Sequence, residues 1–172
     1  MIEARDIRKR FGDQQVLDGV NFSIANGESV AIIGRSGAGK SVLLKHLVGL
    51  VQPDEGQLLV NGEDITCMTE RQLLGVRSRY GMLFQGAALF DSLTVAQNIA
   101  FALRGQRDLT AEEVAERVAA MLKLIELSGI EEKMPAELSG GMKKRVGLAR
   151  AIIHRPEIIL YDEPTTGLDP MV

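Results

Sequence analysis

Short apolar runs, rich in β-branched residues and bounded by turn residues, recur along the chain and predict strands. The first two runs are separated by Gly12 and Asp13, which are typical turn residues. A third run, Ser-Val-Ala-Ile-Ile at residues 29–33, ends at a glycine-rich loop, and its composition predicts a buried strand. The predicted strands cover residues 2–11, 16–24, 29–33, 57–60, 80–84 and 157–161.

Between these runs, apolar residues recur at helical spacing. After the glycine-rich loop, Val42, Leu43, Leu47 and Leu50 predict a helix within residues 39–50. Residues 110–113, Thr-Ala-Glu-Glu, have capping-box spacing and precede a helical apolar face. Two more helices are predicted at residues 69–76 and 139–153, the second with Lys143, Lys144 and Arg150 off its apolar face. Strands and helices in this order predict an α/β fold.

The composition is that of a globular protein, and it narrows the classes of partner. The 172 residues, 45% hydrophobic and 25% charged, suffice for one core, so one domain over residues 1–172 is expected. The net charge of −3 offers no basic excess for a phosphate backbone, which makes nucleic acid an unexpected partner. The single cysteine, Cys67, cannot form an internal disulfide, which fits a reducing compartment. No apolar run is long enough to cross a bilayer, so a membrane role must come through a partner.

The glycine-rich loop matches the pattern Gly, four residues, Gly, Lys, then Ser or Thr. Glycines let backbone N–H groups turn toward an anion, and the following helix directs the positive end of its dipole to the same point. ATP with Mg²⁺ is the natural ligand, with Lys40 reaching the β- and γ-phosphates and the Ser41 hydroxyl binding the metal. The predicted nucleotide-binding residues of this loop are Gly34, Arg35, Ser36, Gly37, Ala38, Gly39, Lys40, Ser41 and Val42.

Two carboxylates, Asp162 and Glu163, directly follow the last predicted strand. In open α/β sheets ligands bind at the carboxyl ends of strands, so this pair is expected to face the phosphates. Asp162 would hold Mg²⁺ through water, and Glu163 would orient and deprotonate the attacking water. Taken alone, the pair could equally be a solvated acidic turn before Pro164, but the phosphate loop favours the catalytic interpretation.

Residues 138–142, Leu-Ser-Gly-Gly-Met, open the basic-faced helix. Ser139 is a good N-cap, and the N–H groups of Gly140 and Gly141 have no side chain to obstruct an anion, so the helix start is a second candidate phosphate site. The segment resembles the signature sequence of the ATP-binding-cassette (ABC) family, in which it completes the ATP pocket of a second copy, so that two copies sandwich two nucleotides. The resemblance covers essentially the whole chain. It implies a P-loop NTPase fold with an antiparallel β subdomain, a parallel-sheet core and a helical subdomain.

Other positions match the same family in their order along the chain. Phe11 stands where an aromatic side chain stacks on adenine, with a core strand residue as the alternative. Gln85 resembles the glutamine that contacts Mg²⁺ or the attacking water and senses the membrane subunit, with a plain loop glutamine as the alternative. Residues 167–170, Gly-Leu-Asp-Pro, resemble the loop that communicates across the dimer.

Within the family, the chain resembles the ATPases of the Mla-type phospholipid transporters, also described as toluene-tolerance transporters. The resemblance rests on Met142, where the family usually has glutamine, and on residues 82–90, Met-Leu-Phe-Gln-Gly-Ala-Ala-Leu-Phe. It implies lipid traffic between the two membranes of Gram-negative bacteria, powered from the cytoplasmic face of the inner membrane. The implied partners are an integral membrane permease and a substrate-binding lipid-carrier subunit. Residues 86–95 would form part of the groove that receives a permease helix, with a buried loop as the alternative.

The family pocket also uses a histidine on a strand beyond Glu163, and this chain has only His46 and His154. Both are expected to be structural, since His154 stands at the end of a predicted helix, where an imidazole meets the helix dipole favourably. The chain is therefore expected to be a C-terminally cut version of a longer domain. The isolated fragment is expected to bind ATP weakly and to turn it over very slowly.

Two other functions remain open on the sequence. One is a soluble ABC ATPase that acts on DNA or ribosomes, which the acidic charge balance and the lack of a long coiled-coil segment disfavour. The other is a nucleotide-binding module without turnover, which the missing histidine leaves possible for residues 1–172.

Overall fold

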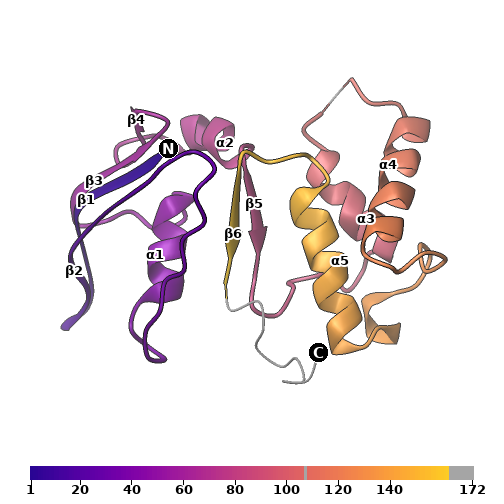
Figure 1. The fold of residues 1–172 in the computed structure, drawn as a ribbon, viewed down its shortest axis with the longest axis horizontal. Coiled ribbons are helices and arrows are strands. Elements are labelled where there is room, and N and C mark those ends of the chain that lie inside the picture. The colour runs from indigo at the N-terminus through magenta and orange to yellow at the C-terminus, as the bar shows by residue number, and fades with distance from the viewer. Residues whose placement is uncertain (107, 163–172) are drawn as a thin grey trace. The chain divides into compact units, whose positions relative to one another are not determined.

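The computed structural model describes residues 1–106 and 108–162 (Figure 1). The chain divides into two compact units, the first from Met1 to Ser78 and the second beginning at Arg79. The first contains an antiparallel sheet and the glycine-rich loop, and the second contains a parallel strand pair with helices. The predicted α/β fold with an antiparallel β subdomain, parallel strands and a helical subdomain is confirmed. The single domain expected over residues 1–172 stays a prediction.

The first unit is built on a four-stranded antiparallel sheet in the order β2-β1-β3-β4. Ile2 of the central strand pairs with Ile24 on one side and with Val60 on the other. A register shift between Ala4 and Ile7 lets Ile2, Ala4 and Ile7 all reach the buried face, since a bulge restores the inward direction. The strands are β1 Ile2–Phe11, β2 Gln14–Ile24, β3 Glu55–Val60 and β4 Glu63–Asp64.

Two eight-residue helices complete the first unit, α1 Lys40–Leu47 and α2 Glu70–Arg77 (Figure 1). The Thr69 side chain accepts a hydrogen bond from the Gln72 backbone N–H, and the Gln72 side chain accepts one from the Thr69 N–H. This reciprocal capping box fixes where α2 begins. The Arg77 side chain donates to the Val48 and Gly49 carbonyls and so joins α2 to the end of α1. The predicted helices at residues 39–50 and 69–76 are confirmed.

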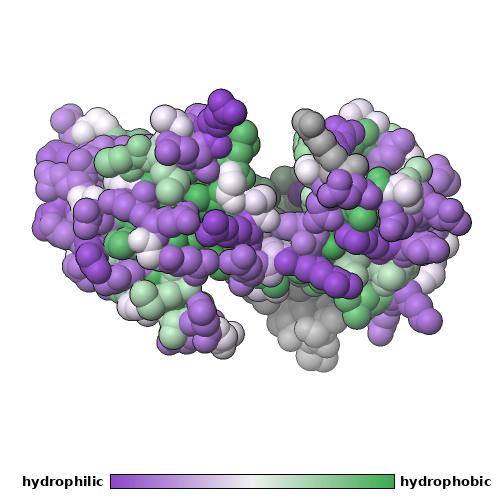
Figure 2. Space-filling view, turned by 90° about the horizontal axis from the view of Figure 1, so that it is seen from above, coloured by the Kyte–Doolittle hydropathy of each residue, from purple (hydrophilic) through white to green (hydrophobic). Residues whose placement is uncertain are grey.

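The strand predicted for residues 29–33 is wrong, because the structure assigns no strand there. Val30 and Ile33 of this segment are 52% and 94% exposed. Apolar residues also reach the surface of the molecule elsewhere, where Figure 2 colours them green. An apolar run becomes a strand only where a neighbour supplies backbone hydrogen bonds, and the antiparallel sheet of the first unit pairs its four strands without this segment.

The second unit combines two parallel strands with a helical cluster. β5 Tyr80–Leu83 and β6 Ile158–Tyr161 pair in register from Tyr80 with Ile158 to Leu83 with Tyr161. Three α-helices and two 3₁₀ turns pack around an apolar core that includes Ile99, Leu122 and Val146, all fully buried. These elements are α3 Val95–Ala100, η1 Phe101–Leu103, α4 Ala111–Leu124, η2 Pro135–Glu137 and α5 Gly140–Ile152.

Helix α4 begins at the predicted capping box, with the Thr110 side chain accepting from the Glu113 N–H. Helix α3 was not predicted, although Thr94 and Gln97 form the same kind of box at its start. Its six residues are too few for a helical period to stand out in the sequence. The signal that could have found α3 is therefore the Thr-x-x-Gln spacing alone.

Strand β5 lies against helix α5 at a contact that only glycine permits. A Cβ added to Gly81 would lie 2.2 Å from the Ala151 carbonyl oxygen and 2.9 Å from Pro156. Neither neighbour can move easily, because one is helix backbone and the other a proline ring. Glycine at position 81 therefore allows the strand to lie this close to the helix.

We expect Gly81→Ala to lower the free energy of unfolding by about 3 kcal/mol, the upper range of overpacking costs. Urea denaturation followed by circular dichroism measures the change. Gly75→Ala is the matched control, since Gly75 lies in α2 with no atom within 4 Å of an added Cβ. That change should leave stability unaltered or raise it by about 0.5–1 kcal/mol through helix propensity. Equal effects of the two substitutions would contradict the packing argument.

Candidate functional site

The glycine-rich loop of the first unit leads into helix α1, which begins at Lys40 with Gly39 as its N-cap. Gly37 and Gly39 have φ angles of 79° and 86°, in the left-handed region that favours glycine. A Cβ on Gly39 would also lie 3.0 Å from the Val16 carbonyl oxygen of β2. The loop geometry therefore depends on both the backbone freedom and the small size of glycine at this position.

The Lys40 ammonium lies across this loop. Its Nζ donates to the Gly34 carbonyl at 3.0 Å and to the Arg35 carbonyl at 3.1 Å, while the Ala38 N–H donates to the Arg35 carbonyl at 3.2 Å. Residues 34–38 are exposed to solvent. A positive charge, a helix N-terminus and an exposed loop thus meet at one place, which is the arrangement that binds a phosphate group.

Phe11 ends strand β1 and is 49% exposed, with the Lys9 ammonium 5.5 Å from its ring centroid. The alternative of a core residue is therefore wrong. The two residues before Phe11 are tied to Asp54, whose carboxylate accepts hydrogen bonds from the Arg10 N–H and from Lys9 Nζ, both at 2.7 Å. Both hydrogen bonds lower the pKa of Asp54 below its ordinary value, and the one from the Lys9 side chain has the larger effect. Stacking of Phe11 on adenine stays a prediction.

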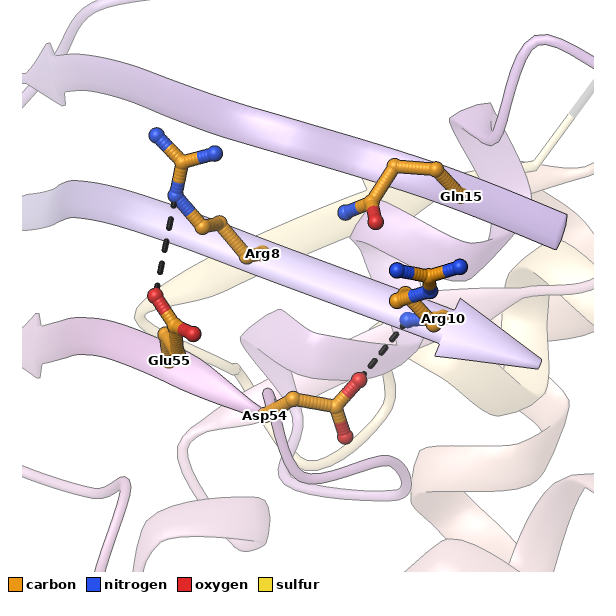
Figure 3. Close-up of a pocket in the computed structure, with 5 residues that line it drawn as sticks. All are labelled: Arg8, Arg10, Gln15, Asp54 and Glu55. Carbon is orange, nitrogen blue, oxygen red and sulfur yellow. Dashed lines mark hydrogen bonds and ion pairs between the residues drawn. The ribbon is translucent and has the colours of Figure 1, made fainter. Parts of the chain in front are cut away.

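A cavity of about 280 Å³ opens on the same sheet and is lined by Arg8, Arg10, Gln15, Asp54 and Glu55 (Figure 3). Its charges are compensated, since Arg8 Nε lies 3.8 Å from Glu55 Oε2 and Asp54 binds the Arg10 backbone. None of the predicted site residues lines it. The cavity is therefore separate from the predicted nucleotide-binding residues of this unit.

Gln85 and Asp162 lie beyond the carboxyl ends of the two parallel strands of the second unit. Leu83 pairs with Tyr161, and the Asp162 N–H donates to the Leu83 carbonyl at 2.9 Å. Gln85 begins the turn of residues 85–88 and is exposed, whereas Asp162 is 9% exposed. Both residues therefore occupy the edge of the strand pair where ligands of parallel sheets bind. Glu163 and residues 167–170 lie outside the described residues.

Helix α5 begins at Ser139 as predicted, with the Ser139 Oγ accepting from the Met142 N–H at 3.3 Å. A Cβ added at Gly140 or Gly141 would meet no atom within 4 Å. The first turn of this 13-residue helix is therefore open to an approaching anion.

The oxygen donors predicted for Mg²⁺ are of the kind that this ion prefers. Ser41 offers a hydroxyl, Gln85 an amide oxygen and Asp162 a carboxylate, all hard ligands. No group of three or more His, Cys, Asp or Glu side chains in residues 1–106 and 108–162 could hold a metal by itself. Mg²⁺ at such a site would take the rest of its ligands from phosphate oxygens and water.

Both histidines contact backbone carbonyls of their own unit, as a structural role requires. His46 Nδ1 lies 2.7 Å from the Val42 carbonyl within α1, and His154 Nε2 lies 3.0 Å from the Tyr80 carbonyl at the start of β5. His46 is 1% exposed. Burial is the main cause that lowers the pKa of its ring below the ordinary value, and it outweighs the hydrogen bond to Val42, which acts in the opposite direction.

We expect stability to fall as the pH drops below about 6.5, the ordinary histidine pKa. The unfolded chain then binds a proton at His46 that the folded chain resists, so the contribution is complete above that pH and declines below it. Urea midpoints between pH 7.5 and 5.5 measure it. His46→Gln keeps a donor for Val42 and should flatten this dependence, whereas an unchanged slope would contradict the assignment.

The fold and the lysine-bridged loop define a P-loop nucleotide-binding protein. Residues 17–166 match the sequence profile of the ABC transporter family. Since this match spans most of the chain, the protein belongs to the ABC transporter family, and the chain is its ATPase domain. No described helix is both long enough and apolar enough to span a membrane.

Two relatives cover 99% of this chain. The protein TRIGALACTOSYLDIACYLGLYCEROL 3, chloroplastic, of Arabidopsis thaliana is 44% identical over 179 residues, and the probable ribonucleotide transport ATP-binding protein mkl of Mycobacterium leprae is 44% identical over 170 residues. The chain covers 51% and 49% of their respective lengths, so it spans about half of each relative.

A solved structure is similar to this chain in fold. The ATP-binding cassette MJ0796, described as the dimeric structure of a post-hydrolysis state bound to ADP and Pi, superposes with a TM-score of 0.91 at 32% identity. The superposition covers 99% of this chain and 77% of the cassette.

Proposed function

We propose that the protein is the ATP-binding and ATP-hydrolysing subunit of an ABC transporter and powers a separate membrane permease. One observation carries the proposal. Lys40 bridges the carbonyls of an exposed glycine-rich loop at the N-terminus of α1, in a chain of the ABC family. A fixed cation at a helix N-terminus is what a nucleotide triphosphate needs, whereas a merely structural loop does not require a lysine to cross it.

In this proposal each group has one task on the nucleotide. Phe11 stacks on adenine, Lys40 binds the β- and γ-phosphates, and Ser41, Gln85 and Asp162 hold Mg²⁺, which neutralises charge on the phosphate oxygens. Glu163 accepts a proton from the attacking water as the oxygen of that water bonds to the γ-phosphorus. The bond from that phosphorus to the β–γ bridging oxygen breaks, which gives ADP and phosphate.

A second copy of the chain is the proposed partner at the open start of α5. Ser139, Gly140 and Gly141 would bind the γ-phosphate held by the other copy's loop, so that each ATP joins two subunits. The exposed, unobstructed first turn of α5 supports this arrangement. The description of MJ0796 as a dimer with ADP and Pi supports it as well.

The permease is proposed to dock on residues 86–95. The alternative of a buried loop disagrees with its exposure, since Phe90 is 42% exposed and Asp91 and Ser92 also reach solvent. The loop is nevertheless well held, because the buried Asn98 side chain bonds to the Phe90 N–H and to the Phe90, Leu93 and Thr94 carbonyls. A rigid loop with an exposed aromatic side chain suits the receipt of an apolar helix.

The proposed cargo is a phospholipid moved between the inner and outer membranes of a Gram-negative bacterium. The ATPase would then sit on the cytoplasmic face of the inner membrane, in a complex with the permease and a substrate-binding lipid-carrier subunit. The Mla-type resemblance at residues 82–90 and Met142 supports this, as does the acylglycerol in the name of the Arabidopsis relative. Ribonucleotide transport, named for the mycobacterial relative, is the second candidate.

The decisive experiment purifies the complete protein from membranes and measures ATP turnover together with co-purifying integral membrane proteins. The proposal expects both hydrolysis and a multi-spanning partner. Turnover without such a partner would favour a soluble ABC ATPase, whereas ATP binding without turnover would favour a regulatory module. Reconstitution of the complex with fluorescent phospholipid or labelled ribonucleotide then separates the two cargoes.

A further inference from the structure

The turn that follows Gln85 has an unusual backbone. Ala87 and Ala88 have φ angles of 60° and 45°, in the left-handed region that residues with a Cβ disfavour. The Ala87 N–H donates to the Phe84 carbonyl at 2.9 Å and closes the turn. Two successive alanines in this conformation persist only where other contacts hold them.

Those contacts come from Arg150, which lies in the last turn of helix α5. Its Nη1 donates to the Ala88 carbonyl at 2.8 Å and its Nη2 to the Ala87 carbonyl at 2.6 Å. The guanidinium also lies 5.8 Å from the Phe90 ring centroid. The planar fork of an arginine suits two adjacent carbonyls, a geometry that lysine cannot reproduce. Burial lowers the pKa of this guanidinium from its ordinary value, so its charge is partly withdrawn from water.

Helix α5 touches the same turn one helical turn earlier. A Cβ added to Gly147 would lie 3.0 Å from the Ala87 Cβ and 3.0 Å from the Leu83 Cδ1. Gly147 and Arg150 are three residues apart and share one helix face. The helix therefore contacts the turn by close packing at one point and by charge-assisted hydrogen bonds at the other.

We propose that Arg150 is a positioning residue that fixes Gln85 through the Ala87-Ala88 turn. This inference rests on the proposed function, in which Gln85 touches Mg²⁺ or the attacking water. Ser139 caps one end of helix α5 and Arg150 lies in its last turn, so the helix links the proposed phosphate site to the Ala87-Ala88 turn. Phosphate binding at Ser139 by one subunit would thereby place Gln85 of that same subunit.

The test is a double-mutant cycle in the complete protein, with kcat and KM for Mg-ATP measured for Arg150→Met, Gln85→Ala and the double variant. Arg150→Met should lower kcat about tenfold, with the Kd of a fluorescent ATP analogue changed less than twofold. In the Gln85→Ala background it should lower kcat less than twofold, because Gln85 is the group through which Arg150 acts. Arg150→Lys should recover part of the loss, since one carbonyl can still be bound.

Arg145→Met is the matched control, because Arg145 lies on the same helix and also donates to a backbone carbonyl, that of Ile125, at 3.1 Å. It should change kcat less than twofold. An equal loss from Arg150→Met in both backgrounds would overturn the inference and leave the proposed function standing. Absence of turnover in the unmodified protein would instead overturn the proposed function. If Arg150→Met does not fold, Arg150→Lys in the two backgrounds gives the same comparison.

Discussion

Lys40→Ala is expected to weaken ATP binding by the complete protein by on the order of a hundredfold. Lys40 bridges the Gly34 and Arg35 carbonyls, and the proposal assigns it to the β- and γ-phosphates. A hydrogen bond to a charged group contributes about 1.5–3 kcal/mol, and each 1.4 kcal/mol is about tenfold in affinity. Alanine keeps the helix propensity of α1 and removes the cation together with its two hydrogen bonds to the loop. Isothermal titration with a non-hydrolysable ATP analogue measures the change.

Lys45→Ala serves as the control for charge, because Lys45 is exposed in the last turn of the same helix, at the opposite end from the loop. It should leave the affinity within about twofold, the range expected of a solvated surface charge. Melting temperatures of both variants show whether the loop fold survives. An unchanged affinity for Lys40→Ala in a folded protein would end the assignment of the loop as a nucleotide site.

Glu163→Gln is expected to lower ATP turnover by the complete protein by about 10²–10⁴-fold while ATP binding persists. The amide keeps the size of the side chain and its place after β6, but it cannot accept a proton from water. Steady-state phosphate release measures kcat, and isothermal titration with a non-hydrolysable ATP analogue measures affinity. Because ATP stays bound without being hydrolysed, the proposed ATP-joined dimer should last longer in this variant than in the unmodified protein. Size-exclusion chromatography measures the fraction of dimer.

Two further variants separate the role of Glu163 from metal binding and from a general loss of charge. Asp162→Asn should reduce turnover and also raise the Mg²⁺ concentration needed, since this carboxylate is assigned to the metal. Glu132→Gln removes the charge of an exposed glutamate of the second unit and should leave kcat within about twofold. If Glu163→Gln turned over at the rate of Glu132→Gln, the general base would have to be another group.

Local patterns predicted most elements because their causes lie close together in sequence. The capping boxes at Thr69 and Thr110 satisfy backbone donors three residues away, and Ser139 does the same for α5. The loop of residues 34–41 is equally local, since glycine freedom and one lysine shape it. Gln85 and Asp162 needed a further step, because their common edge follows from the parallel pairing of β5 with β6.

The sequence by itself therefore determined the phosphate loop, the class of the fold and the starts of the described α-helices other than α3. Tertiary structure decided what depends on partners distant in the chain. Residues 29–33 carry a strand pattern yet have no strand assigned, because apolar composition does not supply backbone hydrogen-bond partners. For Phe11 the sequence favoured a ligand contact but left a core position open, and only its exposure in the structure excluded the core. Arg150 reaches carbonyls more than sixty residues away, a contact that no local period encodes.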